Sequence, residues 1–113
     1  MTPGRRITLM TSDRIVGYLT PVSTDQPFLV CRFEAGPAWK DVGLTFARHA
    51  AAGAASDATE VAAAQRAFDA WSLALVDDSG RPPITRFARV ILGDQANLRT
   101  QFSEMCERGW FPT

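Results

Sequence analysis

The alternation of apolar and polar positions is clearest near the end of the chain. Residues 84–92 and 95–102 both carry this alternation, and only Gly93 and Asp94 lie between them. A period of two is typical of a strand that buries one face. Glycine readily adopts the positive φ that a tight two-residue loop requires. The pattern therefore predicts a β-hairpin.

A loop at Gly93 and Asp94 also sets which residues of this hairpin lie opposite one another. One face pairs Ile91 with Ala96, Arg89 with Leu98, and Phe87 with Thr100. The same face carries Phe102, so we expect it to face the core, with Arg89 as its charged member. The other face pairs Ala88 with Arg99, Val90 with Asn97, and Leu92 with Gln95.

The first third of the chain predicts three more strands. The apolar runs 7–10 and 15–19 flank a polar segment and predict a hairpin with Ser12 and Asp13 as its loop. That loop places Leu9 opposite Val16, and Ile7 opposite Tyr18. Residues 28–33 are apolar at nearly every position. Such a run is typical of a central strand with both faces covered, or with one face flanked by an interface.

The middle of the chain has apolar residues spaced three and four apart. This spacing predicts a first helix over about 37–52, ended by Gly53, and a second helix that begins near Asp57. Asp57 followed by Glu60 matches a capping box. The two apolar stripes are Trp39, Gly43, Phe46 and Ala50, then Val61, Ala64, Phe68 and Trp71. Residues 50–58 have low complexity and are expected to be a mobile connection between the helices.

Together these segments predict a single α+β domain over residues 1–113, in the order β-β-β-α-α-β-β-β. Residues 72–76 supply a strand after the helices, and a short helix runs from Ser103 to Arg108. We expect an antiparallel sheet of about five or six strands with two helices packed on one face. The expected core contains Leu9, Val16, Leu29, Cys31, Phe33, Phe46, Val61, Phe68, Phe87, Ile91 and Leu98.

The charge balance narrows the classes of partner. Twelve basic and twelve acidic residues give a formal net charge of zero. Proteins dedicated to nucleic acids or anionic membranes usually carry a basic excess, so both partners are disfavoured. No run is long and apolar enough to predict a membrane span or a secretory signal. Cys31 and Cys106 do not make a disulfide framework, although they could pair, and a cytoplasmic location is expected.

Few residues offer catalytic or ligand-binding chemistry. The chain has no glycine-rich nucleotide motif, metal-binding cysteine pair or nucleophile motif, so neither a cofactor nor a metal is expected. Arg89, on the predicted core face, needs a carboxylate, a phosphate or access to solvent. Arg89, Glu34 and His49 are the candidate ligand-binding residues if a cleft forms between sheet and helices. Asp77 and Asp78 are interpreted as a turn rather than a cation site.

The outer face of the second hairpin is the most informative surface for function. It mixes apolar residues with arginine, a composition common at protein interfaces, and an aromatic tail follows it. The candidate interaction surface consists of Arg86, Val90, Leu92, Asn97, Arg99, Gln101, Trp110 and Phe111. The last two pack either on their own domain or on another subunit.

The sequence thus favours a small non-catalytic protein-interaction module that binds a partner or itself as a homo-oligomer. The alternatives are a small-molecule-binding protein or enzyme with a cleft between sheet and helices, and nucleic-acid binding through the arginines of the hairpin.

Overall fold

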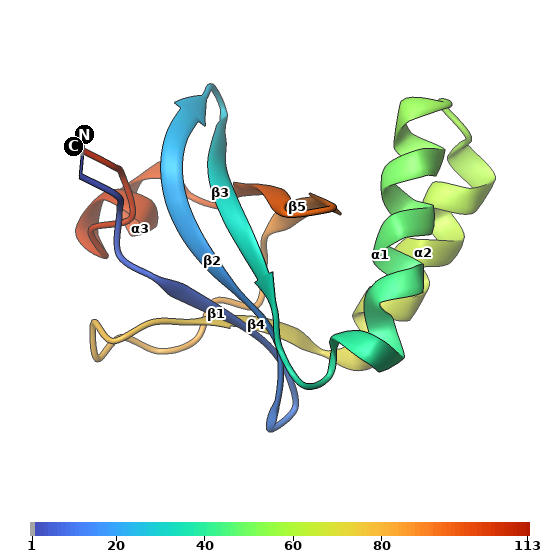
Figure 1. Ribbon diagram of the computed structural model, residues 1–113, viewed down its shortest axis with the longest axis horizontal. Coiled ribbons are helices and arrows are strands. Elements are labelled where there is room, and N and C mark those ends of the chain that lie inside the picture. Colours follow the sequence, from blue (N-terminus) through green and yellow to red (C-terminus); the bar gives the residue numbers. More distant parts are fainter. Residues whose placement is uncertain (1) are drawn as a thin grey trace.

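Six antiparallel strands form one curled sheet in the computed structural model, which describes residues 2–113 (Figure 1). The strands are β1 (Ile7–Thr11), β2 (Arg14–Asp25), β3 (Phe28–Ala35), β4 (Leu73–Val76), β5 (Ala88–Leu92) and β6 (Gln95–Arg99). Their order across the sheet is β4-β1-β2-β3-β6-β5. The predicted α+β class, antiparallel sheet and element order are confirmed.

The two outer strands of this sheet are joined by the segment that follows β4. Ile84 in this segment exchanges two backbone hydrogen bonds with Leu75 of β4, at N–O distances of 2.8 and 2.9 Å. The chain then continues directly into β5. The edge of β4 is therefore partly covered by the segment that leads to the opposite edge of the sheet.

Two long helices, α1 (Trp39–Ala54) and α2 (Ala58–Trp71), pack together and stand beside the sheet (Figure 1). Helix α1 contacts β5 and β2. Phe46 lies at the centre of the contact, with its ring 5.3 Å from Trp39 and 4.6 Å from Phe68 between centroids. A short helix, α3 (Phe102–Glu107), lies on the opposite side of the molecule, near both chain ends (Figure 1).

The boundary between the two long helices differs in part from the prediction. Helix α2 begins as expected, because the Asp57 carboxylate accepts a hydrogen bond of 3.2 Å from the Glu60 N–H. Helix α1, however, continues through Gly53 to Ala54. Alanine has the highest helix propensity, and the alanines around Gly53 sustain the helix past the glycine. The connection consists of residues 55–57 only.

The first hairpin has a different register from the predicted one. Leu9 lies opposite Gly17, and Ile7 lies opposite Leu19, so the predicted pairs are wrong by one residue. A β-bulge in this hairpin leaves Val16 without a partner on β1. An extra residue on one strand shifts every later pair by one. Val16 is nevertheless buried, as the sequence predicts.

The predicted core residues are buried, with Val61 as the exception. Val61 lies in the first turn of α2, next to the connection between the helices, and is half-buried. The core also contains buried residues that the sequence analysis did not select: Ile7, Leu19, Ala38, Val42, Ala64, Leu73, Leu75, Ala96, Met105 and Trp110.

Candidate functional site

The second hairpin, β5–β6, presents one buried face and one exposed face. Its register is the predicted one, with Ile91 opposite Ala96 and Arg89 opposite Leu98. The side chains of Ile91, Ala96 and Leu98 are buried in the core. Phe102 does not extend this face, because β6 ends at Arg99 and the chain turns into α3, where Phe102 is exposed.

The exposed face of the hairpin continues onto β3. Register places Val90, Asn97 and Val30 in one row across three strands. The next row consists of Leu92, Gln95 and Arg32. Cross-strand partners lie side by side on the same face of a sheet, so these rows form one surface. We call these six residues, together with Arg99 at the end of β6, the hairpin surface.

Two apolar side chains stand out on the hairpin surface. Leu92 is 65% exposed and Val90 is 38% exposed. Together with Gln95 and Asn97 they line a shallow hollow of about 220 Å³. Covering such an exposed leucine with apolar surface is favourable in free energy, because it removes apolar area from water.

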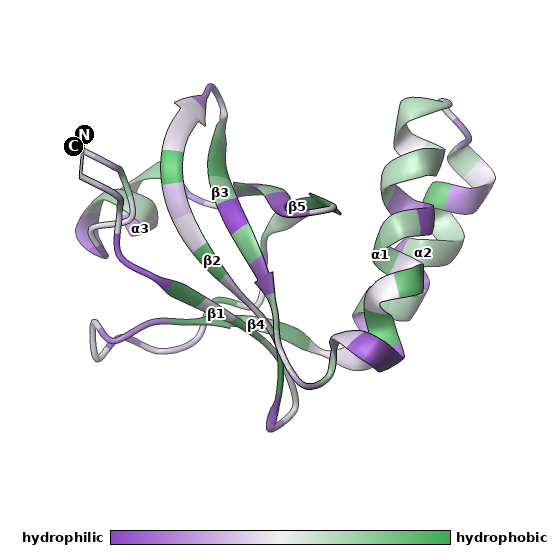
Figure 2. Cartoon of the chain, in the orientation of Figure 1, coloured by the Kyte–Doolittle hydropathy of each residue, from purple (hydrophilic) through white to green (hydrophobic). Residues whose placement is uncertain are grey.

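Strand β3 contributes Val30 and Arg32 to this surface. Its residues are all apolar from Phe28 to Cys31, and hydrophilic and hydrophobic residues then alternate from Arg32 to Ala35 (Figure 2). Leu29, Cys31 and Phe33 face the core, whereas Val30 is half-buried and Arg32 is exposed on the other face. The apolar run 28–33 therefore has one covered face and one that is open in part. Val30 and Arg32 are absent from the predicted surface because sequence alone does not show that β3 lies beside β6.

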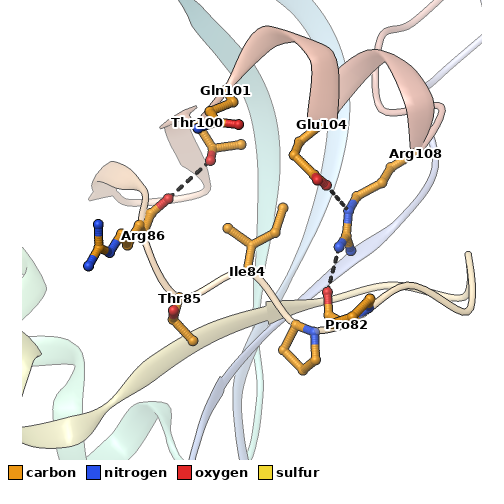
Figure 3. A pocket seen from close by; sticks show the side chains of 9 residues that line it. Pro82, Ile84, Thr85, Arg86, Thr100, Gln101, Glu104 and Arg108 are labelled. Carbon is orange, nitrogen blue, oxygen red and sulfur yellow. Dashed lines mark hydrogen bonds and ion pairs between the residues drawn. The ribbon is translucent and has the colours of Figure 1, made fainter.

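Arg86 and Gln101 lie beyond the last pair of the β5–β6 ladder, Ala88 and Arg99, and therefore away from Val90 and Leu92. They line a larger hollow of about 390 Å³, between the segment before β5 and helix α3 (Figure 3). The Thr100 hydroxyl donates a 3.0 Å hydrogen bond to the backbone carbonyl of Arg86 and holds the two sides together.

The aromatic tail divides into a buried residue and a half-buried one. Trp110 has no exposed area and belongs to the core, so it contributes nothing to an exposed surface. Phe111 is half-buried, and its ring lies 5.2 Å from that of the exposed Phe102. Of the two arrangements considered for the tail, Trp110 adopts packing on its own domain.

A buried polar cluster under the tail was missed by the sequence analysis. The side chain of Arg108 is 3% exposed and donates to Glu104, to Asp77 and to the carbonyl of Pro82. The Asp77 carboxylate also accepts from the Trp110 indole N–H at 2.6 Å. The spacing of Glu104 and Arg108, one helical turn apart, is the local signal that could have indicated part of it.

The three candidate ligand-binding residues do not form one site. Glu34 lies on the exposed side of β3, with a carboxylate oxygen 4.0 Å from Arg6. Arg89 and His49 both lie against Phe68: the Arg89 guanidinium carbon is 4.9 Å from its ring centroid, and the His49 ring centroid is 5.1 Å away. Burial, and secondarily the charge of Arg89, lower the pKa of His49.

The cysteines are free thiols in different surroundings. Cys31 is buried, and this burial raises the pKa of its thiol to about 12, so it stays protonated and unreactive at neutral pH. Cys106 is exposed on α3. The expectation from sequence that Cys31 belongs to the core is confirmed.

Two further observations describe residues 2–113. No cluster of three or more histidine, cysteine, aspartate or glutamate side chains is arranged to hold a metal ion there. Within the same range, no helix has both the length and the apolar character needed to cross a bilayer.

Comparison with protein-family models, curated proteins and solved structures finds no match to this chain.

Proposed function

We propose that this protein is a small non-catalytic interaction module that binds protein through the hairpin surface. The observation that supports the proposal is the pair of exposed apolar side chains on β5, with Val30 on β3 across the polar residues of β6 and arginines beside them. Leu92 and Val90 are exposed, and Val30 extends the apolar character to a third strand. Arginine is enriched at protein interfaces, and covering the exposed side chains of Leu92 and Val90 removes apolar area from water.

The partner is a second copy of the chain or another protein, since both fit the same chemistry. The net charge of zero removes long-range repulsion between two copies. A cytoplasmic location belongs to the same proposal, because both cysteines are free thiols and disulfides are rare in that compartment.

The first prediction concerns Leu92→Asp. An aspartate on the hairpin surface places a charge where apolar contact is needed, and we expect association to weaken by roughly tenfold or more. Self-association is measured by sedimentation velocity over a concentration series. Partner binding is measured by affinity purification from the native host, in nuclease-treated and untreated halves, with quantitative mass spectrometry.

The matched control is Leu44→Asp. Leu44 lies on α1 and is as exposed as Leu92, at 65% each. Association that is lost in Leu92→Asp and kept in Leu44→Asp supports the hairpin surface. The proposal is wrong if the wild type is monomeric throughout and recovers the same proteins as the Leu92→Asp variant.

Nucleic-acid binding through Arg32, Arg86 and Arg99 is the competing proposal, and the nuclease-treated half separates the two. A partner that is lost with nuclease, together with binding that falls steeply as salt increases, favours nucleic acid. A stoichiometric protein partner that survives nuclease and is insensitive to moderate salt favours the protein interface.

A further inference from the structure

Within residues 2–113, Arg89 is the half-buried arginine that forms no ion pair with a carboxylate. Within residues 2–113, the other arginines that form no ion pair are all exposed: Arg32, Arg48, Arg66, Arg86 and Arg99. Arg89 is half-buried, and no carboxylate oxygen lies within 4.0 Å of it. Burial lowers the pKa of Arg89, and the charge of Asp69 offsets this only in part, so the guanidinium is incompletely compensated.

The surroundings of Arg89 fix the guanidinium in one orientation. Its central carbon lies 4.9 Å from the ring centroid of Phe68 and 4.7 Å from that of Phe87. One terminal nitrogen, Nη2, donates to the Phe87 carbonyl at 2.6 Å. The Nε–H is buried and has no acceptor. The group is held in place, yet donor capacity is left over.

Arg108 shows that this protein can give every nitrogen of a buried guanidinium an acceptor. Its three nitrogens donate to Glu104, Asp77 and the carbonyl of Pro82. The same fold therefore treats two enclosed arginines differently. With the Nε–H of Arg89 buried, the donors that a ligand can reach are on Nη1 and Nη2.

A cavity adjoins Arg89. It has a volume of about 280 Å³ and is lined by Phe68, Asp69, Ser72, Leu73, Thr85 and Arg89. The wall contains one positive group, one carboxylate, two hydroxyls and the apolar side chains of Phe68 and Leu73. It is built from the end of α2, the start of β4, the segment before β5, and β5 itself.

We propose that this cavity binds a small zwitterion of the amino-acid class, with its carboxylate on Arg89 and its ammonium group toward Asp69. Arginine presents two parallel N–H donors that match a carboxylate. Asp69 lines the same cavity and opposes a second negative charge, which disfavours a phosphate dianion. Phe68 and Leu73 offer apolar surface to the ligand side chain.

The other two candidate ligand-binding residues, His49 and Glu34, do not line this cavity. His49 lies against Phe68, outside the wall of the cavity. Burial, and secondarily the charge of Arg89, lower the pKa of His49, which favours its neutral form. Glu34 is near Arg6 and is not part of the cavity.

The experiment is a titration of the ¹⁵N-labelled protein followed by NMR with three probes. L-leucine carries both charges, 4-methylpentanoate lacks the ammonium group, and leucinamide lacks the carboxylate. We expect saturable shifts of the amides around the cavity with leucine, about tenfold weaker binding of 4-methylpentanoate, and no saturable binding of leucinamide. Absence of saturable shifts with leucine at tens of millimolar overturns the proposal.

Variants test the two charged contacts separately. Arg89→Met keeps an unbranched stem and removes the guanidinium, and we expect at least tenfold weaker binding of leucine and of 4-methylpentanoate. Asp69→Asn should weaken leucine binding and leave 4-methylpentanoate binding unchanged or tighter. The control is Arg66→Met, which removes one exposed positive charge from α2 and should change neither.

Thermal unfolding distinguishes a binding role from a structural one. Without ligand, Arg89→Met should unfold near the wild-type temperature, because removing a half-buried charge that forms no ion pair offsets the loss of the hydrogen bond to Phe87 and of the ring contacts. An unfolding temperature well below wild type, with unchanged leucine affinity in Asp69→Asn, assigns Arg89 to structure and contradicts the proposal. Leu92→Asp should bind leucine normally, so this proposal and the proposed interface fail independently.

Discussion

At the scale of single residues, Asp77 shows most clearly what local sequence reveals and what it hides. The sequence predicts a turn here, and the Asp77 carboxylate accepts from the Ser79 N–H at 3.1 Å, as a turn-forming aspartate does. The same carboxylate accepts from Arg108 and Trp110, more than thirty positions away along the chain. No local pattern indicates these partners, because they depend on where the C-terminal segment returns.

The pH dependence of stability should report this carboxylate. Burial by itself raises the pKa of Asp77, but hydrogen bonds from Ser79 and Trp110 and the charge of Arg108 outweigh it, so the pKa is lowered. A lowered folded-state pKa gives stability that is present above the unfolded-state value of about 3.9 and is lost as pH falls through the folded value. We expect Asp77→Asn to be less stable at neutral pH and to lose less stability on acidification.

Denaturant unfolding from neutral pH to about pH 2 measures this difference. Asp78→Asn is the control, since Asp78 is the neighbouring aspartate, is exposed, and contacts Arg5 at the surface. It should follow the wild-type pH profile closely. An Asp77→Asn profile parallel to that of the wild type would remove Asp77 from the acid-sensitive groups.

At the scale of elements, the two hairpins differ in how far sequence predicts them. The second hairpin has a glycine in its two-residue loop, and its register follows from counting outward from that loop. The first hairpin contains a bulge, and the adjacent apolar residues Ile15 and Val16 do not show which of them is the extra residue. Register is therefore predictable from turn chemistry only where the ladder is regular.

Substitution by alanine should have opposite effects on stability at Gly93, in the loop of the second hairpin, and at Gly53, in α1. Gly93 has a φ of +62°, and Gly53 lies within α1. A Cβ added at either site meets no neighbouring atom within 4 Å, so steric clashes contribute to the stability change of neither variant. We expect Gly93→Ala to destabilise by about 1 kcal/mol through its left-handed backbone, and Gly53→Ala to stabilise by about 0.5–1 kcal/mol through helix propensity. Chemical denaturation of both variants measures the signs, and equal signs would contradict this account.

At the scale of the whole molecule, the sheet is assembled by contacts between distant segments. Strand β6 lies beside β3, and β4 lies beside β1. Composition and periodicity predict each strand, but they do not predict these neighbours, because a strand pairs equally well by local measures with any compatible edge. For this reason the hairpin face of the candidate interface can be predicted from sequence, but its extension to Val30 and Arg32 cannot. For the same reason Arg89 can be recognised from sequence as a candidate ligand-binding residue, but the cavity beside it cannot.

Trp110 depends most on this long-range assembly. It is fully buried in the core, its indole N–H donates to Asp77, and the adjacent Gly109 carbonyl accepts from the Arg5 N–H at 3.0 Å. The C-terminal segment thus contacts both the start of the chain and the turn after β4. We expect Trp110→Ala to lower the free energy of unfolding by about 3–5 kcal/mol, the usual cost of removing a buried aromatic side chain.

The control for this variant is Phe111→Ala, which removes a half-buried ring that contacts the exposed Phe102 and should cost clearly less. Hydrogen exchange shows whether the loss is global. If the tail closes a single cooperative core, Trp110→Ala reduces amide protection in β1, β4 and β3 together. Reduced protection confined to α3 and the tail would instead mean that this segment is a separate, locally unfolding unit, and that the sheet is held together without it.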